Sequence, residues 1–226
     1  DCFIRATLTE GVITKVVREI MDGKSVLDLG CCNGRWLDRF KPSYYVGLDL
    51  NNEMLKEARV RYPRAHFAQA NMCCLPFPNG SFDGIISMFG AMCHLPLKSK
   101  QVMVEESIRV LVPGGMAIFT NGYSHSLSAI SITAAGGKVR MEGVPIRVHY
   151  TTPKMFAKLL SDFRLLKIEH YDYSYIPILP FKFIAFLFKR NYKKMYTRWM
   201  NLCNCCRKFP MTRWLGKYIM VVCQKP

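Results

Sequence analysis

The chain has 226 residues, half of them hydrophobic and 12% aromatic, and its 32 Lys and Arg against 16 Asp and Glu give a formal charge of +16. This length and apolar content predict one large domain with a buried core and exclude a disordered chain. Because no run of about 18 uncharged apolar residues occurs, the sequence predicts no membrane-spanning helix. No signal peptide precedes the first motif, and the ten cysteines include three adjacent pairs, which seldom bridge each other, so we expect a cytoplasmic protein with reduced thiols.

Strand-like and helix-like segments alternate through the first two thirds of the chain. After an opening helix around 12–20, the hydrophobic pattern predicts strands over 25–29, 44–50, 65–70, 83–89 and 116–121, with helices over 35–40, 53–62 and 99–111 between them. It then predicts a long loop with some helix over 121–150, a helix over 152–163, a strand over 165–176 and a final strand over 217–223. Such alternation is typical of a doubly wound α/β fold, in which helices cover both faces of a mostly parallel sheet.

The run from Val26 to Gly34 carries the chemistry. An apolar strand ends in an acid, Asp28, and small residues then make a tight turn whose glycines allow backbone N–H groups to approach a ligand. Further along the chain a second strand ends in Asp49, whose carboxylate is placed to accept hydrogen bonds from both hydroxyls of a ribose. A nicotinamide fingerprint would need one more glycine soon after Gly34, and the sequence has none there.

Here the sequence resembles the class I S-adenosylmethionine-dependent methyltransferases, and its final run over 213–222 resembles the end of the quinone-biosynthesis-like group that acts on small molecules. The segments that carry the resemblance are the acid and glycine turn at 28–34, the second strand with its ribose-binding acid at 46–55, the adenine-contacting loop at 69–83, and the turn before the fifth strand at 109–115. The resemblance implies S-adenosylmethionine as cofactor and a Rossmann-like sheet with an antiparallel last strand. It also implies one domain over 1–226, with a cofactor-binding core at 12–121 and acceptor-side segments at 122–150 and 177–216.

The resemblance assigns cofactor binding to nine positions. They are Asp28, Gly30, Cys32 and Gly34 for the methionine end, Asp49 for the ribose, Leu50, Asn71 and Met72 for the adenine, and Met88 beside the methyl group. Cys32 stands where the family usually has glycine, and Asn71 stands where aspartate is commoner. Because both replacements are small and Asn71 keeps an acceptor oxygen, we expect an active enzyme. The alternative is an inactive domain that serves as a basic membrane- or partner-binding module.

Methyl transfer from a sulfonium is a one-step displacement, in which the protein aligns nucleophile, methyl and sulfur in a dry pocket. A general base is needed only where the acceptor must lose a proton. The candidates are His94 after the fourth strand, Tyr123 and His125 after the fifth, and His149 before the late helix. His94 is the favoured one, because the loop after the fourth strand borders the methyl group in this fold.

The end of the chain is strongly basic, with eleven Lys or Arg and no acidic residue over 173–226. Within it, 177–216 is predicted to be a helical insertion before the last strand, with aromatic and basic residues interleaved. It is interpreted as an amphipathic helix on an anionic membrane, a lid over a lipophilic or acidic substrate, an RNA-binding surface, or a helical cap whose rings belong to the core. We favour a small lipophilic or anionic acceptor, with an RNA methyltransferase as the alternative. The C-x-x-C at 203–206 has no second pair, so no metal site is predicted.

Overall fold

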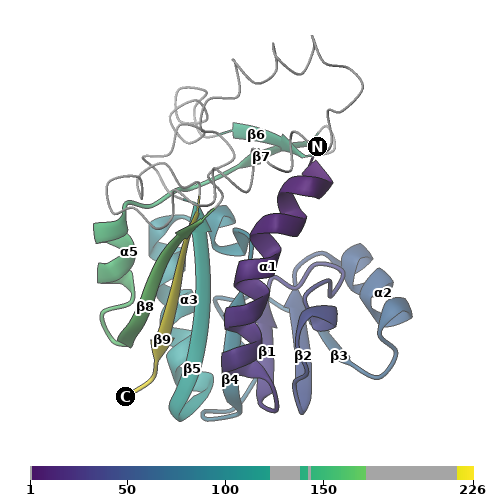
Figure 1. The fold of residues 1–226 in the computed structure, drawn as a ribbon, viewed down its shortest axis with the longest axis horizontal. Coiled ribbons are helices and arrows are strands. Elements are labelled where there is room, and N and C mark those ends of the chain that lie inside the picture. Colours follow the sequence, from purple (N-terminus) through teal and green to yellow (C-terminus); the bar gives the residue numbers. More distant parts are fainter. Residues whose placement is uncertain (1, 123–137, 142–143, 172–217) are drawn as a thin grey trace.

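The computed structural model describes residues 2–122, 138–141, 144–171 and 218–226 and shows a seven-stranded sheet with strand order β3-β2-β1-β4-β5-β9-β8 (Figure 1). The strands are β1 (Ser25–Leu29), β2 (Tyr44–Asp49), β3 (His66–Gln69), β4 (Phe82–Ser87), β5 (Leu111–Gly122), β8 (Arg164–Tyr171) and β9 (Tyr218–Gln224). The first five pair in parallel, whereas β9 runs antiparallel to both β5 and β8. The predicted doubly wound sheet with an antiparallel last strand is confirmed.

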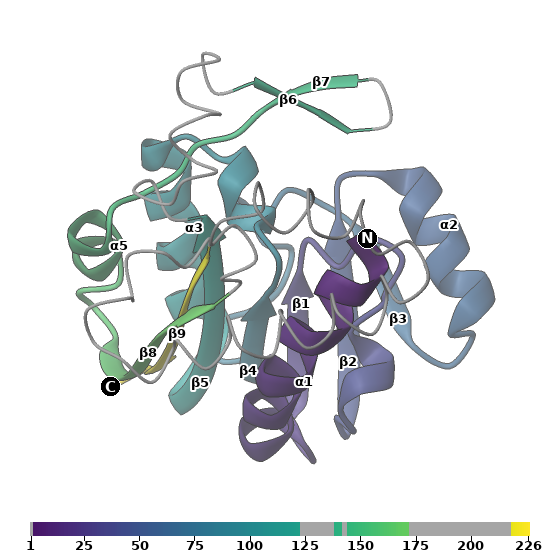
Figure 2. The same cartoon turned by 45° about the horizontal axis from the view of Figure 1, so that its top comes forward.

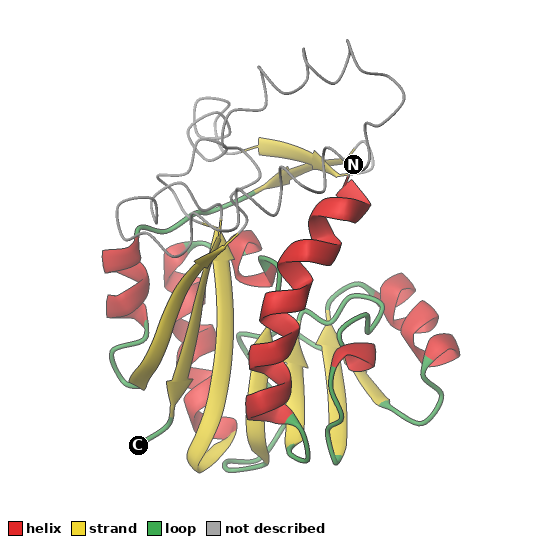
Figure 3. Cartoon of the chain, in the orientation of Figure 1, coloured by secondary structure: helices red, strands yellow, loops and turns green. Residues whose placement is uncertain are grey.

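Helices lie on both faces of this sheet (Figure 3). They are α1 (Cys2–Met21), α2 (Asn52–Arg61), α3 (Leu97–Val110) and α5 (Pro153–Leu159), with short 3-10 helices η1 (Leu37–Arg39) and η2 (Ala91–His94). Helix α1 crosses one face, and α3 and α5 cover the other (Figure 1). Since β4 is buried on both sides, Ile85 packs toward α3 while its neighbour Ile86 packs toward α1.

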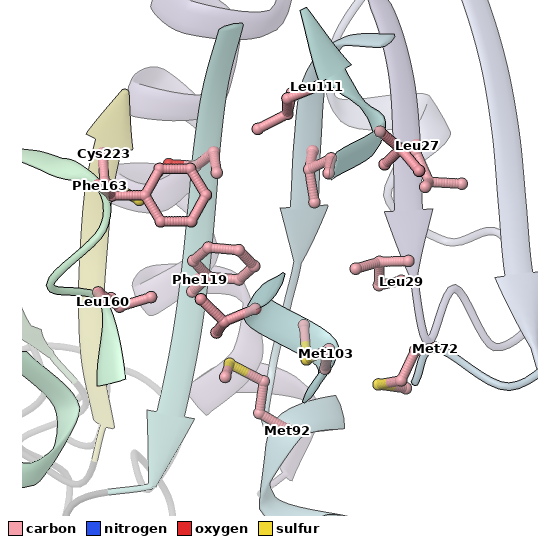
Figure 4. Packing of buried hydrophobic residues seen from close by; sticks show 14 of the residues in the cluster. Leu27, Leu29, Met72, Met92, Met103, Leu111, Phe119, Leu160, Phe163 and Cys223 are labelled. Atoms are coloured by element: carbon pink, nitrogen blue, oxygen red, sulfur yellow. The ribbon is translucent and has the colours of Figure 1, made fainter. Parts of the chain in front are cut away.

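The larger part of the core lies on the α3 side of the sheet (Figure 4). Phe119 of β5 meets Phe163 edge to face at 5.9 Å between ring centroids, and Met92 of η2 and Met103 of α3 belong to the same buried cluster. At the other end of the cluster, Met72 packs near Leu29 of β1. Met72, in the loop after β3, and the short helix after β4 are therefore held by the core that supports β1.

Two local predictions are wrong within the described residues. A helix was expected over 35–40, but only the 3-10 turn η1 forms, because the chain here closes i to i+3 bonds from Leu37 N–H to Gly34 and from Arg39 N–H to Trp36. The expected loop over 121–150 contains a hairpin of β6 (Lys138–Met141) and β7 (Val144–Arg147). The predicted helical insertion at 177–216 lies outside the described residues.

Because β1, β2, β3 and β4 are parallel, their carboxyl ends meet at one edge of the sheet. The hairpin β6–β7 lies beyond this edge in both Figure 1 and Figure 2. Ligands of open α/β sheets bind at the carboxyl ends of the strands. In the described part of the chain, no helix is both long and apolar enough to cross a bilayer.

Candidate functional site

The turn after β1 is tied to the neighbouring strand by its own backbone. The N–H groups of Gly30 and Cys31 both donate to the carbonyl of Leu48, at 2.8 and 3.0 Å. Three residues of the turn adopt a positive φ: Gly30 at 77°, Gly34 at 73° and the non-glycine Cys32 at 53°. The left-handed region strains a residue with a Cβ, so Cys32 is held there by its surroundings.

One of those restraints is Asp49 at the end of β2. Its two carboxylate oxygens accept hydrogen bonds from the N–H of Cys32 and the N–H of Asn51, each at 2.9 Å. Asp49 therefore links the glycine turn to the start of α2, and its side chain lies at the carboxyl edge where the ribose is predicted. The next residue, Leu50, is 61% exposed, as expected of a side chain available to a flat adenine ring.

Asp28 is fully buried in β1, on the α1 side of the sheet. The hydroxyl of Tyr45 in β2 donates a hydrogen bond to one carboxylate oxygen at 2.8 Å. Burial raises the pKa of Asp28 to about 7, with a further rise from the charge of Asp49, while the Tyr45 hydrogen bond and Arg35 oppose that rise. Asp28 is thus partly protonated near pH 7, and a cationic group beside it would favour the ionised form.

The turn packs so closely at Gly30 that a side chain at this position would collide with η2. A Cβ added to Gly30 would lie 2.5 Å from the Cβ of Ala91, because η2 rests directly on the turn. Gly30→Ala must therefore move η2 in addition to straining the backbone.

Gly80→Ala isolates this contact, since Gly80 also has a positive φ but nothing within 4 Å of an added Cβ. We expect Gly80→Ala to lower the free energy of unfolding by about 1 kcal/mol from backbone strain alone. Gly30→Ala should lower it by about 1 to 3 kcal/mol more. Urea unfolding of the two variants measures the difference, and equal losses would show that η2 does not rest on Gly30.

The adenine-side residues lie at the same edge. The side-chain oxygen of Asn71 accepts a hydrogen bond from the Cys73 N–H at 2.9 Å and closes a turn after β3. Asn71 remains exposed, whereas Met72 is buried in the α3-side core and Met88 in the α1-side core. Their predicted contacts with the cofactor stay predictions.

Two buried polar atoms have no hydrogen-bond partner among the described residues: the side-chain oxygen of Asn33 in the glycine turn and the hydroxyl of Ser87 at the end of β4. Such atoms are rare in folded proteins. The oxygen of Asn33 is an acceptor that a ligand ammonium group could donate to. The two carboxylate oxygens of Asp49 are placed to accept hydrogen bonds from two vicinal hydroxyls. The residues present therefore fit S-adenosylmethionine.

The acceptor side is built around η2 and the segment that follows β7. The backbone N–H of His149 donates to the Cys93 carbonyl at 2.7 Å, and the backbone of Arg147 lies close to the ring of His94. Desolvation by neighbouring atoms lowers the pKa of His94, so its imidazole is neutral at pH 7. The structure thus brings two of the four candidate bases, His94 and His149, onto two segments that contact each other; Tyr123 and His125 lie outside the described residues.

Comparison with known proteins agrees with this geometry. Residues 26–115 match the family model for the methyltransferase domain. The match starts at β1 and ends inside β5, so it contains the glycine turn, Asp49 and η2. Residues 26–115 form a class I, S-adenosylmethionine-dependent methyltransferase domain.

Relatives resemble this methyltransferase domain over less than half of the chain. An uncharacterised protein of Methanocaldococcus jannaschii is 42% identical over 105 residues, which are 46% of this chain and 39% of the relative. A fatty-acid O-methyltransferase of Mycolicibacterium smegmatis is 36% identical over 107 residues, which are 45% of this chain and 38% of that enzyme. The chain therefore matches about two fifths of the length of these curated relatives.

Solved structures extend the likeness to nearly the whole chain. An S-adenosylmethionine-dependent methyltransferase from Mesorhizobium loti superposes with a TM-score of 0.62 at 17% identity, covering 96% of this chain and 97% of that one. At this identity the likeness shows the fold.

Sequence reasoning missed two residues of the methyltransferase domain that the structure places beside the site. Tyr45 reaches Asp28 only because of the parallel register of β1 and β2, in which Asp28 lies opposite Gly47. Lys100 is buried on the core face of α3, with Met103, Val104 and Ser107. The spacing of these four positions was a usable signal, because it places a lysine on an apolar helix face.

Proposed function

We propose that this chain transfers the methyl group of S-adenosylmethionine to a small lipophilic acid by in-line displacement. The observation that carries the proposal is the glycine turn bound by Asp49 at the carboxyl edge of a methyltransferase domain. The cofactor supplies the electrophilic methyl group when bound. A carboxylate oxygen of the acceptor would attack that methyl carbon as the carbon–sulfur bond breaks, and the electron pair would go to sulfur, leaving S-adenosylhomocysteine and a methyl ester.

The residues of this chain divide the binding between them. Asp49 accepts from the ribose hydroxyls, and Asp28 with Asn33 receives the ammonium of the methionine end. Since an ionised carboxylate has no proton to lose, the proposed acceptor needs no general base. His94, whose ring lies close to the backbone of Arg147, then borders the acceptor side.

Two observations support an acidic, lipophilic acceptor. The formal charge of +16 produces a field that attracts anions, and one similar protein is a fatty-acid O-methyltransferase. The interleaved aromatic and basic residues over 177–216 have the composition expected of a surface that binds apolar chains with a negative end. Contact with an anionic membrane, from which such an acid could be drawn, belongs to the same proposal.

The test supplies S-adenosylmethionine with an isotopically labelled methyl group and a series of saturated fatty acids. We expect labelled methyl esters in the organic extract by mass spectrometry. The matching fatty alcohols, which lack the ionised oxygen, should remain unmethylated and serve as the control. A protein that binds S-adenosylhomocysteine but methylates no fatty acid would disprove the acceptor class, and a folded protein that binds neither would disprove the methyltransferase activity.

A further inference from the structure

Lys100 carries a positive charge in the interior of the protein. Its side chain has no solvent exposure and lies on the core face of α3. An ammonium loses its hydration on burial and normally needs a carboxylate to offset that loss. Among the described residues no carboxylate contacts it, so another arrangement holds the ammonium.

That arrangement consists of neutral oxygens. The Lys100 ammonium donates to the backbone carbonyl of His149 and, at 3.3 Å, to the side-chain oxygen of Asn121 at the end of β5. The same Asn121 oxygen accepts a hydrogen bond from the Cys93 thiol of η2 at 3.2 Å. The Asn121 amide nitrogen in turn donates a hydrogen bond to the hydroxyl of Thr151. One buried lysine thus joins α3, β5, η2 and the segment after β7.

The segment after β7, residues 148–152, is called the connector. Besides the Lys100 bond, it is held by backbone bonds from His149 N–H to the Cys93 carbonyl at 2.7 Å and from Thr151 N–H to the Gly122 carbonyl at 3.3 Å. The ring of Tyr150 occupies the place where a Cβ of Gly122 would lie. The connector therefore joins the rigid end of β5 to the hairpin β6–β7 beyond the carboxyl edge (Figure 2).

We propose that Lys100 is a positioning residue, whose buried ammonium fixes the connector and thereby sets the place of His94, His149 and the hairpin on the acceptor side. It acts through the connector and touches neither cofactor nor acceptor. The kinetic consequence rests on the proposed function, whereas the effect on the connector does not.

The energetics separate this role from a purely structural one. Burial lowers the pKa of Lys100 to about 8, which shows that the fold disfavours the charge it contains. Lys100→Met keeps the length and apolar stem of the side chain and removes that charge together with its two hydrogen bonds. Relief of the buried charge and loss of the bonds oppose each other, so we expect the melting temperature to change little. A residue that mainly stabilises the fold would instead lower the melting temperature clearly.

The direct test is hydrogen–deuterium exchange of the His149 and Thr151 amides. In Lys100→Met we expect both to exchange about tenfold faster than in the wild type, because the connector opens more often. Lys98→Met, the same change at an exposed position of the same helix, should leave both rates unchanged. Unchanged exchange in a folded Lys100→Met protein would overturn the proposal, as would failure of that variant to fold.

A second measurement needs no variant. Above pH of about 8 the wild-type ammonium loses its charge, so protection of the His149 and Thr151 amides should fall relative to that of the distant Tyr62 amide. The titratable groups that face Lys100 in the described structure are the Cys93 thiol and the His94 ring. Protection that stays constant through this range in the wild type would contradict the proposal.

A kinetic test of Lys100 uses as methyl acceptors the same fatty acids that test the proposed function. Lys100→Met should raise the KM for the acid several-fold while the Kd for S-adenosylhomocysteine stays within experimental error. An equal loss of affinity for the cofactor would overturn the positioning role. If no fatty acid is methylated by the wild type, the acceptor proposal fails and the exchange measurements still decide the role of Lys100.

Discussion

Replacing Asp49 with alanine is expected to weaken the binding of S-adenosylhomocysteine by about 100-fold or more. The carboxylate is placed to accept from two ribose hydroxyls, and hydrogen bonds to a charged group contribute about 1.5 to 3 kcal/mol each. The same oxygens hold the N–H groups of Cys32 and Asn51, so the substitution also releases the glycine turn. Calorimetric titration of S-adenosylhomocysteine into wild type and variant measures the loss.

Two further variants distinguish ribose binding from a general effect of charge. Glu53→Ala removes an exposed carboxylate from the first turn of α2, close to the same edge, and should leave the affinity unchanged. Asp49→Asn keeps one acceptor oxygen and should show an intermediate loss. Circular dichroism establishes that Asp49→Ala is folded; affinity within threefold of the wild type in that folded variant would place the ribose elsewhere.

The part of the fold that the sequence predicts well is the part dominated by local chemistry. Strand β1 has the predicted bounds, because an apolar run ends at a glycine turn that can form only one kind of structure. The acids at the ends of β1 and β2 likewise follow from strand length and turn position. Their meeting at one edge is then a consequence of parallel pairing.

The errors arise where contacts distant in sequence decide the outcome. After the glycine turn, Trp36 and Phe40 are both buried against the α1 side of the sheet, and their spacing of four is also the same-face spacing of a helix, which is why the sequence predicts one here. The chain instead forms the 3-10 turn η1. The hairpin β6–β7 escaped prediction because Pro145 interrupts the strand pattern of its second arm.

In the candidate site, too, the sequence predicts what depends on local motifs and misses what depends on contacts distant in sequence. Asp28 and Asp49 are visible as motif positions, whereas the partners that set their chemistry are not: Tyr45 is 17 residues from Asp28 and Cys32 is 17 residues from Asp49. A motif predicts which residues meet the cofactor. The protonation state of Asp28 and the placement of the connector depend on the three-dimensional register.

Asp28→Asn is expected to remove the largest pH dependence that the described residues give to the stability of this protein between pH 4 and pH 8. The pKa of Asp28 rises from 3.8 to about 7 on folding, so between these values the unfolded chain is ionised while the folded one keeps its proton. Raising the pH through this window therefore favours unfolding, and the wild type should lose up to about 4 kcal/mol of stability between pH 4 and pH 8. Asparagine cannot ionise and still accepts from Tyr45, so its curve should lack this fall.

Asp83→Asn is the matched control, because its expected effect on the stability at neutral pH has the opposite sign to that of Asp28→Asn. Hydrogen bonds from the hydroxyl and N–H of Ser25 lower the pKa of Asp83, so this carboxylate stabilises the fold at neutral pH and its loss should destabilise the protein there. Urea unfolding across the pH range tests both variants, and parallel curves for wild type and Asp28→Asn would show that Asp28 does not titrate. If Asp28 receives the ammonium of the cofactor as proposed, binding at a pH below its pKa of about 7 releases its proton. Calorimetry of S-adenosylhomocysteine near pH 6 in two buffers of different ionisation enthalpy should accordingly show proton release in the wild type and none in Asp28→Asn.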